Sequence, residues 1–127
     1  MFKITADPER NRLTIILAGH LAEAERREAA LAVLAGVAKL QPGFTVINDI
    51  TGLHATDREG LKELARMQNA LKLKGARRMV RVVKIPLSRI QFERTSLDSH
   101  TQVETVASLA DAERLLDAPP SRLPSHA

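Results

Sequence analysis

The sequence contains no cysteine, tryptophan or tyrosine, and only three phenylalanines. The absence of cysteine excludes disulfide bonds, thiolate zinc sites and cysteine nucleophiles. No apolar run approaches the roughly 18 residues that a transmembrane helix needs, and the N-terminal residues lack the basic and then apolar pattern of a signal peptide. We therefore expect a cytoplasmic protein without a transmembrane segment.

The charge of the chain is concentrated in its middle third. The 127 residues are 44% apolar and 27% charged, which is typical of one soluble globular domain. The formal net charge of +4 and the pI of 10.0 hide a strong asymmetry. Residues 1–56 have no net charge, residues 57–94 carry +7 and residues 95–127 carry −3. The basic segment 57–94 therefore needs an explanation.

Two short runs rich in β-branched residues predict a β-hairpin at the start of the chain. The strands cover Phe2–Ala6 and Leu13–Ala18, and the polar stretch between them has the residues of a turn. An Ala-, Glu- and Leu-rich stretch then predicts a helix over Leu21–Leu40, which Pro42 terminates. The positions expected on its buried face are Ala30, Val33, Leu34 and Val37.

The clearest strand is Phe44–Ile50, whose almost continuous apolar character predicts burial on both faces. A capping-box pattern at 56–59, Thr-Asp-Arg-Glu, predicts a helix that runs from there to about Lys74. Gly75 then suits the position just after the helix. The inward positions expected for this helix are Leu61, Leu64, Ala65 and Leu71.

The C-terminal half continues the alternation of strands and helices. Met79–Lys84 predicts a strand, and Val103–Val106 predicts a short edge strand. Pro86 suits the first turn of a helix between them, and Ser108 suits the N-cap of a last helix that ends at Leu116. The apolar positions expected on the first of these helices are Leu87, Ile90 and Leu97.

This order predicts a single compact α/β domain over residues 1–117. A hairpin followed by alternating helices and strands forms a mixed, mostly parallel sheet that is flanked by helices. Residues 118–127 contain proline and serine, and we expect them to form a disordered tail. No internal repeat suggests a second domain.

The order and the spacing of these elements resemble the STAS domain, the fold of bacterial anti-sigma-factor antagonists. In that family an apolar strand precedes the motif Asp-Ser-Ser-Gly-Leu, which opens the next helix. Here the strand ending in Asn48-Asp49 is followed by Asp-Arg-Glu-Gly-Leu at 57–61. The Gly-containing loop and strand over residues 74–83 also resemble the family. The resemblance implies a STAS-like fold and a non-catalytic regulatory module.

The same motif departs from the family at the position that controls partner binding. In anti-sigma-factor antagonists, a kinase phosphorylates the first Ser after the Asp. Here Arg58 stands in that position and Glu59 in the next. The resemblance therefore implies a module without the phosphoserine switch.

The first candidate site is a partner surface at the start of the 57–74 helix and the basic loop after it. Helix capping explains Asp57 and Glu59. It does not explain Arg58, because a cation is unfavourable in the first turn of a helix, so Arg58 indicates contact with a partner or an anion. The basic residues suit an acidic protein partner, self-association or simple solvation. The candidate residues of this surface are Asp57, Arg58, Glu59, Lys62, Arg66, Arg77 and Arg78.

The second candidate site lies beyond the carboxyl ends of the strands, where open α/β sheets bind ligands. It suits an anionic lipid or nucleotide, whose charge Lys84, Arg81 or Arg58 would neutralise. The alternative is that these polar residues form turns or are solvated. The candidate ligand residues are Asn48, Asp49, His54, Arg81 and Lys84.

Other function classes find little support in the sequence. The four histidines are widely separated, and no nucleophile, metal or phosphate-loop motif occurs, so we expect no enzyme, no metal and no cofactor. Basic stripes bind phosphate backbones, but proteins that bind single strands stack bases on aromatic side chains. The scarcity of aromatics makes nucleic acid the least favoured partner.

Overall fold

The computed structural model describes residues 1–54, 58–83 and 103–118. They form a five-stranded sheet with the order β1-β2-β3-β4-β5. Strands β1 (Phe2–Asp7) and β2 (Arg12–Gly19) pair antiparallel. Strands β3 (Thr45–Leu53), β4 (Arg78–Val82) and β5 (Glu104–Val106) follow in parallel. The predicted α/β class, the hairpin and the mostly parallel sheet are confirmed.

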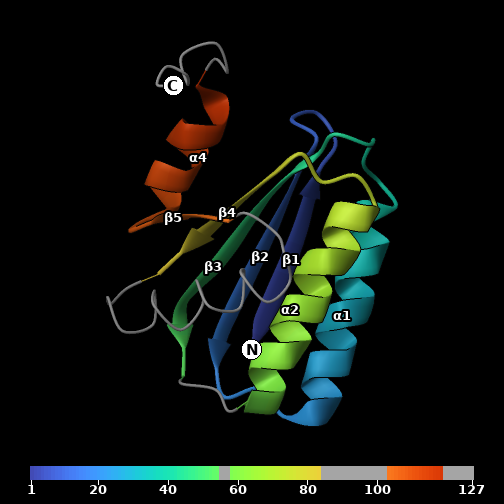
Figure 1. The fold of residues 1–127 in the computed structure, drawn as a ribbon, viewed down its shortest axis with the longest axis vertical. Helices are drawn as coiled ribbons and strands as arrows, with labels where there is room; N and C mark the ends of the chain where they lie inside the picture. Colours follow the sequence, from blue (N-terminus) through green and yellow to red (C-terminus); the bar gives the residue numbers. More distant parts are fainter. Residues whose placement is uncertain (55–57, 84–102, 119–127) are drawn as a thin grey trace.

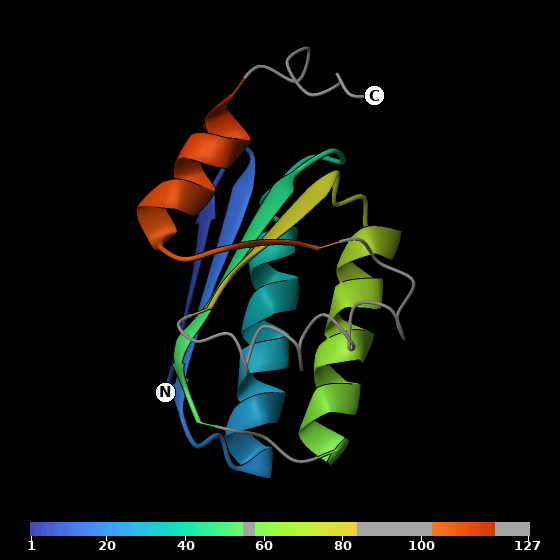
Figure 2. The same cartoon turned by 60° about the vertical axis from the view of Figure 1, so that its left-hand side comes forward.

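Helices cover both faces of the sheet. Helices α1 (Glu23–Val37) and α2 (Arg58–Leu73) lie side by side on one face, and α4 (Leu109–Asp117) lies on the other (Figures 1 and 2). Strand β3 is buried on both faces, as predicted, because Val46 faces the core under α1 and α2 while Ile47 faces the core under α4. The chain therefore has two apolar cores, one on each side of the sheet.

Local signals at the helix ends are also confirmed. The Ser108 hydroxyl oxygen accepts a hydrogen bond from the Asp111 amide at 3.0 Å and caps α4. Gly75, which follows α2, has a φ of 109°, a conformation that favours glycine. The predicted helix from Pro86, the capping residues Thr56 and Asp57, and the tail after Ala118 lie outside the described residues.

The predicted buried face of α1 is wrong by about a quarter turn. Ala30 and Leu34 are exposed, whereas Ala29 and Gly36 are buried together with the expected Val33 and Val37. Small residues at these positions let the helix backbone approach β1 and β2 closely. The helix is also shorter than predicted, because it begins at Glu23 and ends at Val37.

A buried arginine, Arg12, links strand β2 to helix α4. Arg12, in β2, donates from Nη2 to the Asp117 carboxylate at 2.7 Å and from Nε to the Thr45 hydroxyl at 3.3 Å. The hydrogen bond from Arg12 holds the pKa of Asp117 below the ordinary value of 3.8. This carboxylate therefore binds a proton less readily in the folded chain than in the unfolded chain.

We expect replacement of Asp117 by asparagine to lower stability at neutral pH and to leave it almost unchanged at very low pH. Because folding lowers the pKa, the stabilisation is complete above the unfolded pKa and is lost as the pH falls through the folded pKa. Urea unfolding of Asp117→Asn and wild type at pH 7 and pH 2 measures this difference. Glu113→Gln, at an exposed position of the same helix, is the control. Equal effects of the two variants at pH 7 would contradict the prediction.

Candidate functional site

Two residues of the predicted partner surface share one exposed face of α2. Lys62 and Arg66 lie one helical turn apart, and both are exposed. Arg77 is exposed in the turn between α2 and β4. Arg58 and Glu59 form the first turn of α2, and Asp57 lies outside the described residues.

Arg78 does not belong to this face. Its guanidinium binds the Glu104 carboxylate, with Nε and Nη2 at 3.0 and 2.7 Å from Oε1, and Nη1 also donates to the Leu115 carbonyl at 3.4 Å. These contacts lie toward β5 and α4, on the side of the sheet opposite α2. The structure therefore gives Arg78 a role in holding β5 and α4 to β4.

The exposed charges from position 60 of α2 to Arg77, in the turn after the helix, have one sign. Glu63 is the only acidic residue between positions 60 and 78, and its carboxylate lies 2.6 Å from Nε of Arg26 in α1. The other charged residues in this stretch, apart from Arg78, are basic and exposed. We call them the α2 basic surface: Lys62, Arg66, Lys72, Lys74 and Arg77.

The four predicted ligand residues that the structure describes do not converge on one site. Asn48 and Arg81 are neighbours in the β3–β4 register, and both are buried on the side of the sheet that faces α2. Asp49 follows Asn48 and so points to the opposite face, where its Oδ1 accepts hydrogen bonds from the Thr51 amide and hydroxyl. His54 lies beyond the end of β3, and Lys84 lies outside the described residues.

The space beside Asn48 and Arg81 is too small for a lipid or a nucleotide. The cavity there has a volume of about 10 Å³, which is the size of one water molecule. Gln68 of α2 also lines it and is 3% exposed, although the sequence suggested only apolar inward positions on this helix. These buried polar groups therefore belong to the core between α2 and the sheet.

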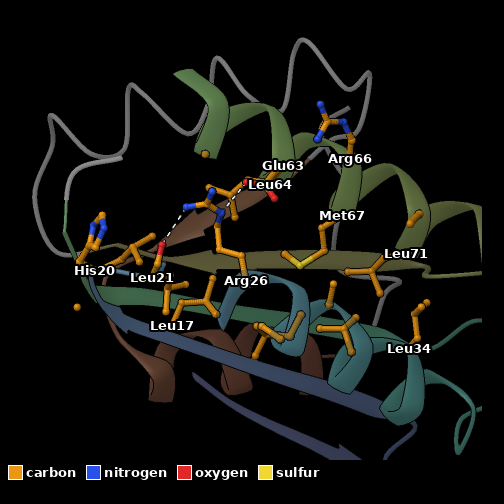
Figure 3. Close-up of a pocket in the computed structure, with 18 of the residues that line it drawn as sticks. Leu17, His20, Leu21, Arg26, Leu34, Glu63, Leu64, Arg66, Met67 and Leu71 are labelled. Carbon is orange, nitrogen blue, oxygen red and sulfur yellow. Dashed lines mark hydrogen bonds and ion pairs between the residues drawn. The ribbon is translucent and has the colours of Figure 1, made fainter. Parts of the chain in front are cut away.

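A much larger cavity lies between α1 and α2, and the sequence did not reveal it. Its volume is about 510 Å³, and β2 and the residues after it complete its lining (Figure 3). Leu17, Val33, Leu64, Met67 and Leu71 contribute apolar side chains. Ala30 and Leu34 also line it, which explains why they are exposed although the helical spacing placed them inward.

An ion pair connects the two helices at this cavity. Arg26 of α1 lies beside Glu63 of α2, and its Nη1 donates to the Leu21 carbonyl at 2.9 Å (Figure 3). The exposed side chains of His20, His54, Arg66 and Lys74 also border the cavity. The charged groups around the opening are therefore mostly basic.

Metal ligands and membrane spans are not found in the described part of the chain. No group of three or more His, Asp or Glu side chains there could hold a metal ion. None of the helices over residues 1–54, 58–83 and 103–118 is long and apolar enough to cross a bilayer.

Solved structures show which fold this arrangement is. An anti-sigma factor antagonist from Mycobacterium paratuberculosis has a TM-score of 0.64 and 18% identity, over 93% of this chain and 96% of that one. A variant of RsbS from Moorella thermoacetica has a TM-score of 0.70 and 15% identity, over 91% and 93%. An uncharacterised Shewanella loihica protein with a SpoIIAA-like fold has a TM-score of 0.69 and 14% identity, over 91% and 92%. The chain has the STAS-like fold.

These similarities confirm the STAS-like fold that the order and the spacing of the sequence elements suggested. No protein-family model and no curated protein matches the chain. Identities of 14–18% to these STAS-like structures show a shared architecture. The function of this chain has to be argued from its own residues.

Proposed function

We propose that this chain is a non-catalytic regulatory module that binds a protein with an acidic surface through the α2 basic surface. The observation that carries the proposal is the single sign of the exposed charges from Lys62 to Arg77. Glu63, the one carboxylate in this stretch, is already paired with Arg26. A surface of one sign steers and selects a partner of the opposite sign.

The neighbours of the fold support a protein partner. Anti-sigma-factor antagonists are named for their action on another protein, and two of the solved structures similar to this chain bear that name. In that family the switch serine stands at the start of the helix that corresponds to α2. Here Arg58 occupies the equivalent place, so we propose a constitutive contact without a phosphorylation switch. The proposal keeps the cytoplasmic location that the sequence suggests.

We expect the double charge reversal Lys62→Glu/Arg66→Glu to weaken partner binding at least tenfold. Both side chains are exposed, so the change reverses the surface without disturbing the core. The partner is identified by mass spectrometry after capture on the wild-type chain, is then purified, and its Kd is measured by calorimetry for each variant. Binding should also weaken as ionic strength rises toward 0.15 M, where screening shortens to about 8 Å.

The matched control is Lys3→Glu/Lys39→Glu, which has the same change of net charge at two exposed positions away from α2. Wild-type affinity in the control and a tenfold loss in the α2 variant support the proposal. Equal losses in both variants would instead mean that only total charge matters. Sedimentation of the free chain shows whether the partner is a second copy, in which case the α2 variant sediments as a monomer.

A further inference from the structure

The cavity between α1 and α2 has the size and the lining of a small-molecule site. Ligand cavities in proteins are about 300–1,000 Å³ and mostly apolar, and this one has a volume of about 510 Å³. Its walls are aliphatic side chains and Met67, and α1 and α2 expose them to the opening (Figure 3). Contact with an apolar ligand would remove apolar surface from water, which favours binding.

The lining indicates an aliphatic ligand. No Phe, Tyr or Trp side chain occurs among the described residues that line the cavity, and the two imidazoles, of His20 and His54, lie at its opening. A planar base or ring within the described walls would therefore pack on aliphatic side chains and not on a phenyl or indole ring. Leu, Val, Ala and Met side chains instead fit a flexible hydrocarbon chain, and the volume suits one such chain better than the two chains of a membrane phospholipid.

The charges at the opening select the headgroup. Arg26, Arg66 and Lys74 border the cavity together with His20 and His54, and Glu63 is the only carboxylate among the described lining residues. Glu63 lies 2.6 Å from Arg26, and the formal charges of the described lining residues, three basic and one acidic without the histidines, sum to +2. A carboxylate or phosphate would gain from these cations, and an ammonium group would be repelled.

We propose that this cavity binds a single-chain amphiphile with an anionic headgroup. The hydrocarbon chain lies between α1 and α2 over β2, and the headgroup lies among the basic side chains of the rim. This ligand site is independent of the protein partner, because it lies on the side of α2 that faces the cavity. The partner surface also includes Lys62, Lys72 and Arg77, which do not line the cavity.

Four probes with the same alkyl chain test the headgroup: dodecanoate, dodecyl phosphate, 1-dodecanol and dodecyltrimethylammonium. The three charged probes are titrated below their critical micelle concentrations and the alcohol below its solubility limit, and binding is followed by calorimetry. We expect the two anions to bind at least tenfold more tightly than the alcohol, and the cation more weakly still. The ratio of the two anions distinguishes a fatty acid from a lysophospholipid. Equal binding of anion, alcohol and cation would overturn the assignment of the headgroup.

The methionines give a direct readout of the place of binding. The chain has three, and of these only Met67 lines the large cavity, while Met79 is buried in the core and Met1 is exposed. Methyl spectra of the chain labelled at methionine should show a shift of the Met67 signal on addition of dodecanoate and no shift of the Met1 signal. Binding that leaves the Met67 signal in place would overturn the proposal.

Matched variants test the cavity itself. Ala30 lines the cavity and is exposed, so Ala30→Trp should fill the space and weaken dodecanoate at least tenfold without strain in the core. Ala35→Trp, on the same helix but away from the cavity, should bind as wild type does. Ala70→Trp fills the cavity from α2 and replaces Ala30→Trp if that variant fails to fold. Unchanged binding in both filling variants would overturn the proposal.

A charge variant completes the test of the rim. Lys74→Glu should reduce the preference for dodecanoate over 1-dodecanol, whereas Lys72→Glu, at an exposed position that does not line the cavity, should leave it unchanged. Equal effects of the two substitutions would show that the rim does not select the headgroup.

Discussion

Replacement of Phe44 by alanine is expected to lower the free energy of unfolding by about 3–5 kcal/mol. Phe44 is 1% exposed and lies directly before β3, in the core under α1 and α2. The Phe44 carbonyl accepts a hydrogen bond from the Arg77 amide at 2.7 Å. This bond holds the backbone at Phe44 against the turn that precedes β4. The backbone at position 44 therefore cannot move inward to fill the space that the phenyl ring leaves. Since whole domains unfold with about 5–15 kcal/mol, this loss is a large part of the total.

Urea unfolding followed by far-ultraviolet circular dichroism measures this loss, because the chain has no tryptophan or tyrosine to report by fluorescence. Leu73→Ala is the control, since Leu73 is 88% exposed and its truncation should change stability by less than about 0.5 kcal/mol. A Phe44→Ala midpoint equal to that of Leu73→Ala would contradict the packing described for β3.

Replacement of Gly36 by leucine is expected to destabilise the chain by about 1–3 kcal/mol or more. A Cβ at this position would lie 2.8 Å from Cδ1 of Leu13, and Ile4 and Ala6 also lie within 4 Å. Leu13 is fully buried, so α1 would have to move away from the hairpin. The gain of about 1 kcal/mol from replacing a helical glycine is smaller than this cost.

Ala35→Leu isolates the steric effect, because it places the same side chain one residue earlier on the exposed side of α1. We expect the control to unfold within about 0.5 kcal/mol of wild type in the same urea experiment. A stability of Gly36→Leu equal to that of the control would mean that α1 lies farther from β1 and β2 than the structure shows.

The parts of the fold that could be predicted depend on local chemistry. Apolar character on both faces marked β3 as a central strand, and the Ser108 hydroxyl and Gly75 marked the start of α4 and the end of α2. The hairpin followed from two β-branched runs around a polar turn, in which the Asp7 carboxylate accepts hydrogen bonds from the amides of Glu9 and Arg10. Each of these signals acts within a few residues, so one sequence is enough to read it.

The parts that could not be predicted depend on distant neighbours. The buried face of α1 contains Gly36 because β1 and β2 approach the helix there, and helical spacing alone cannot distinguish that face from the adjoining one with Leu34. Likewise, Arg78 has the same charge as Arg77, and only the position of Glu104 in β5 removes it from the basic surface. Tertiary contacts decide such cases.

The sequence also predicted one part of the candidate site and missed another. Lys62 and Arg66 lie on the same face of α2 because they are spaced by one turn, and both are exposed. The large cavity was not predictable, because the space between two helices depends on how each packs on the sheet. Asn48 and Arg81 are neighbours in the sheet and line the same small cavity, but in a buried position, since both point into the core under α2.

Helix α2 forms one wall of the cavity and also carries the α2 basic surface, with Arg66 and Lys74 common to both. Two binding events that share one rigid element are thermodynamically linked whenever the first changes the position or the mobility of that element. The coupling is reciprocal, so an amphiphile that strengthens partner binding by some factor is itself held more tightly by the same factor when the partner is bound. Through α2, the concentration of a small molecule would then regulate how tightly the partner is bound.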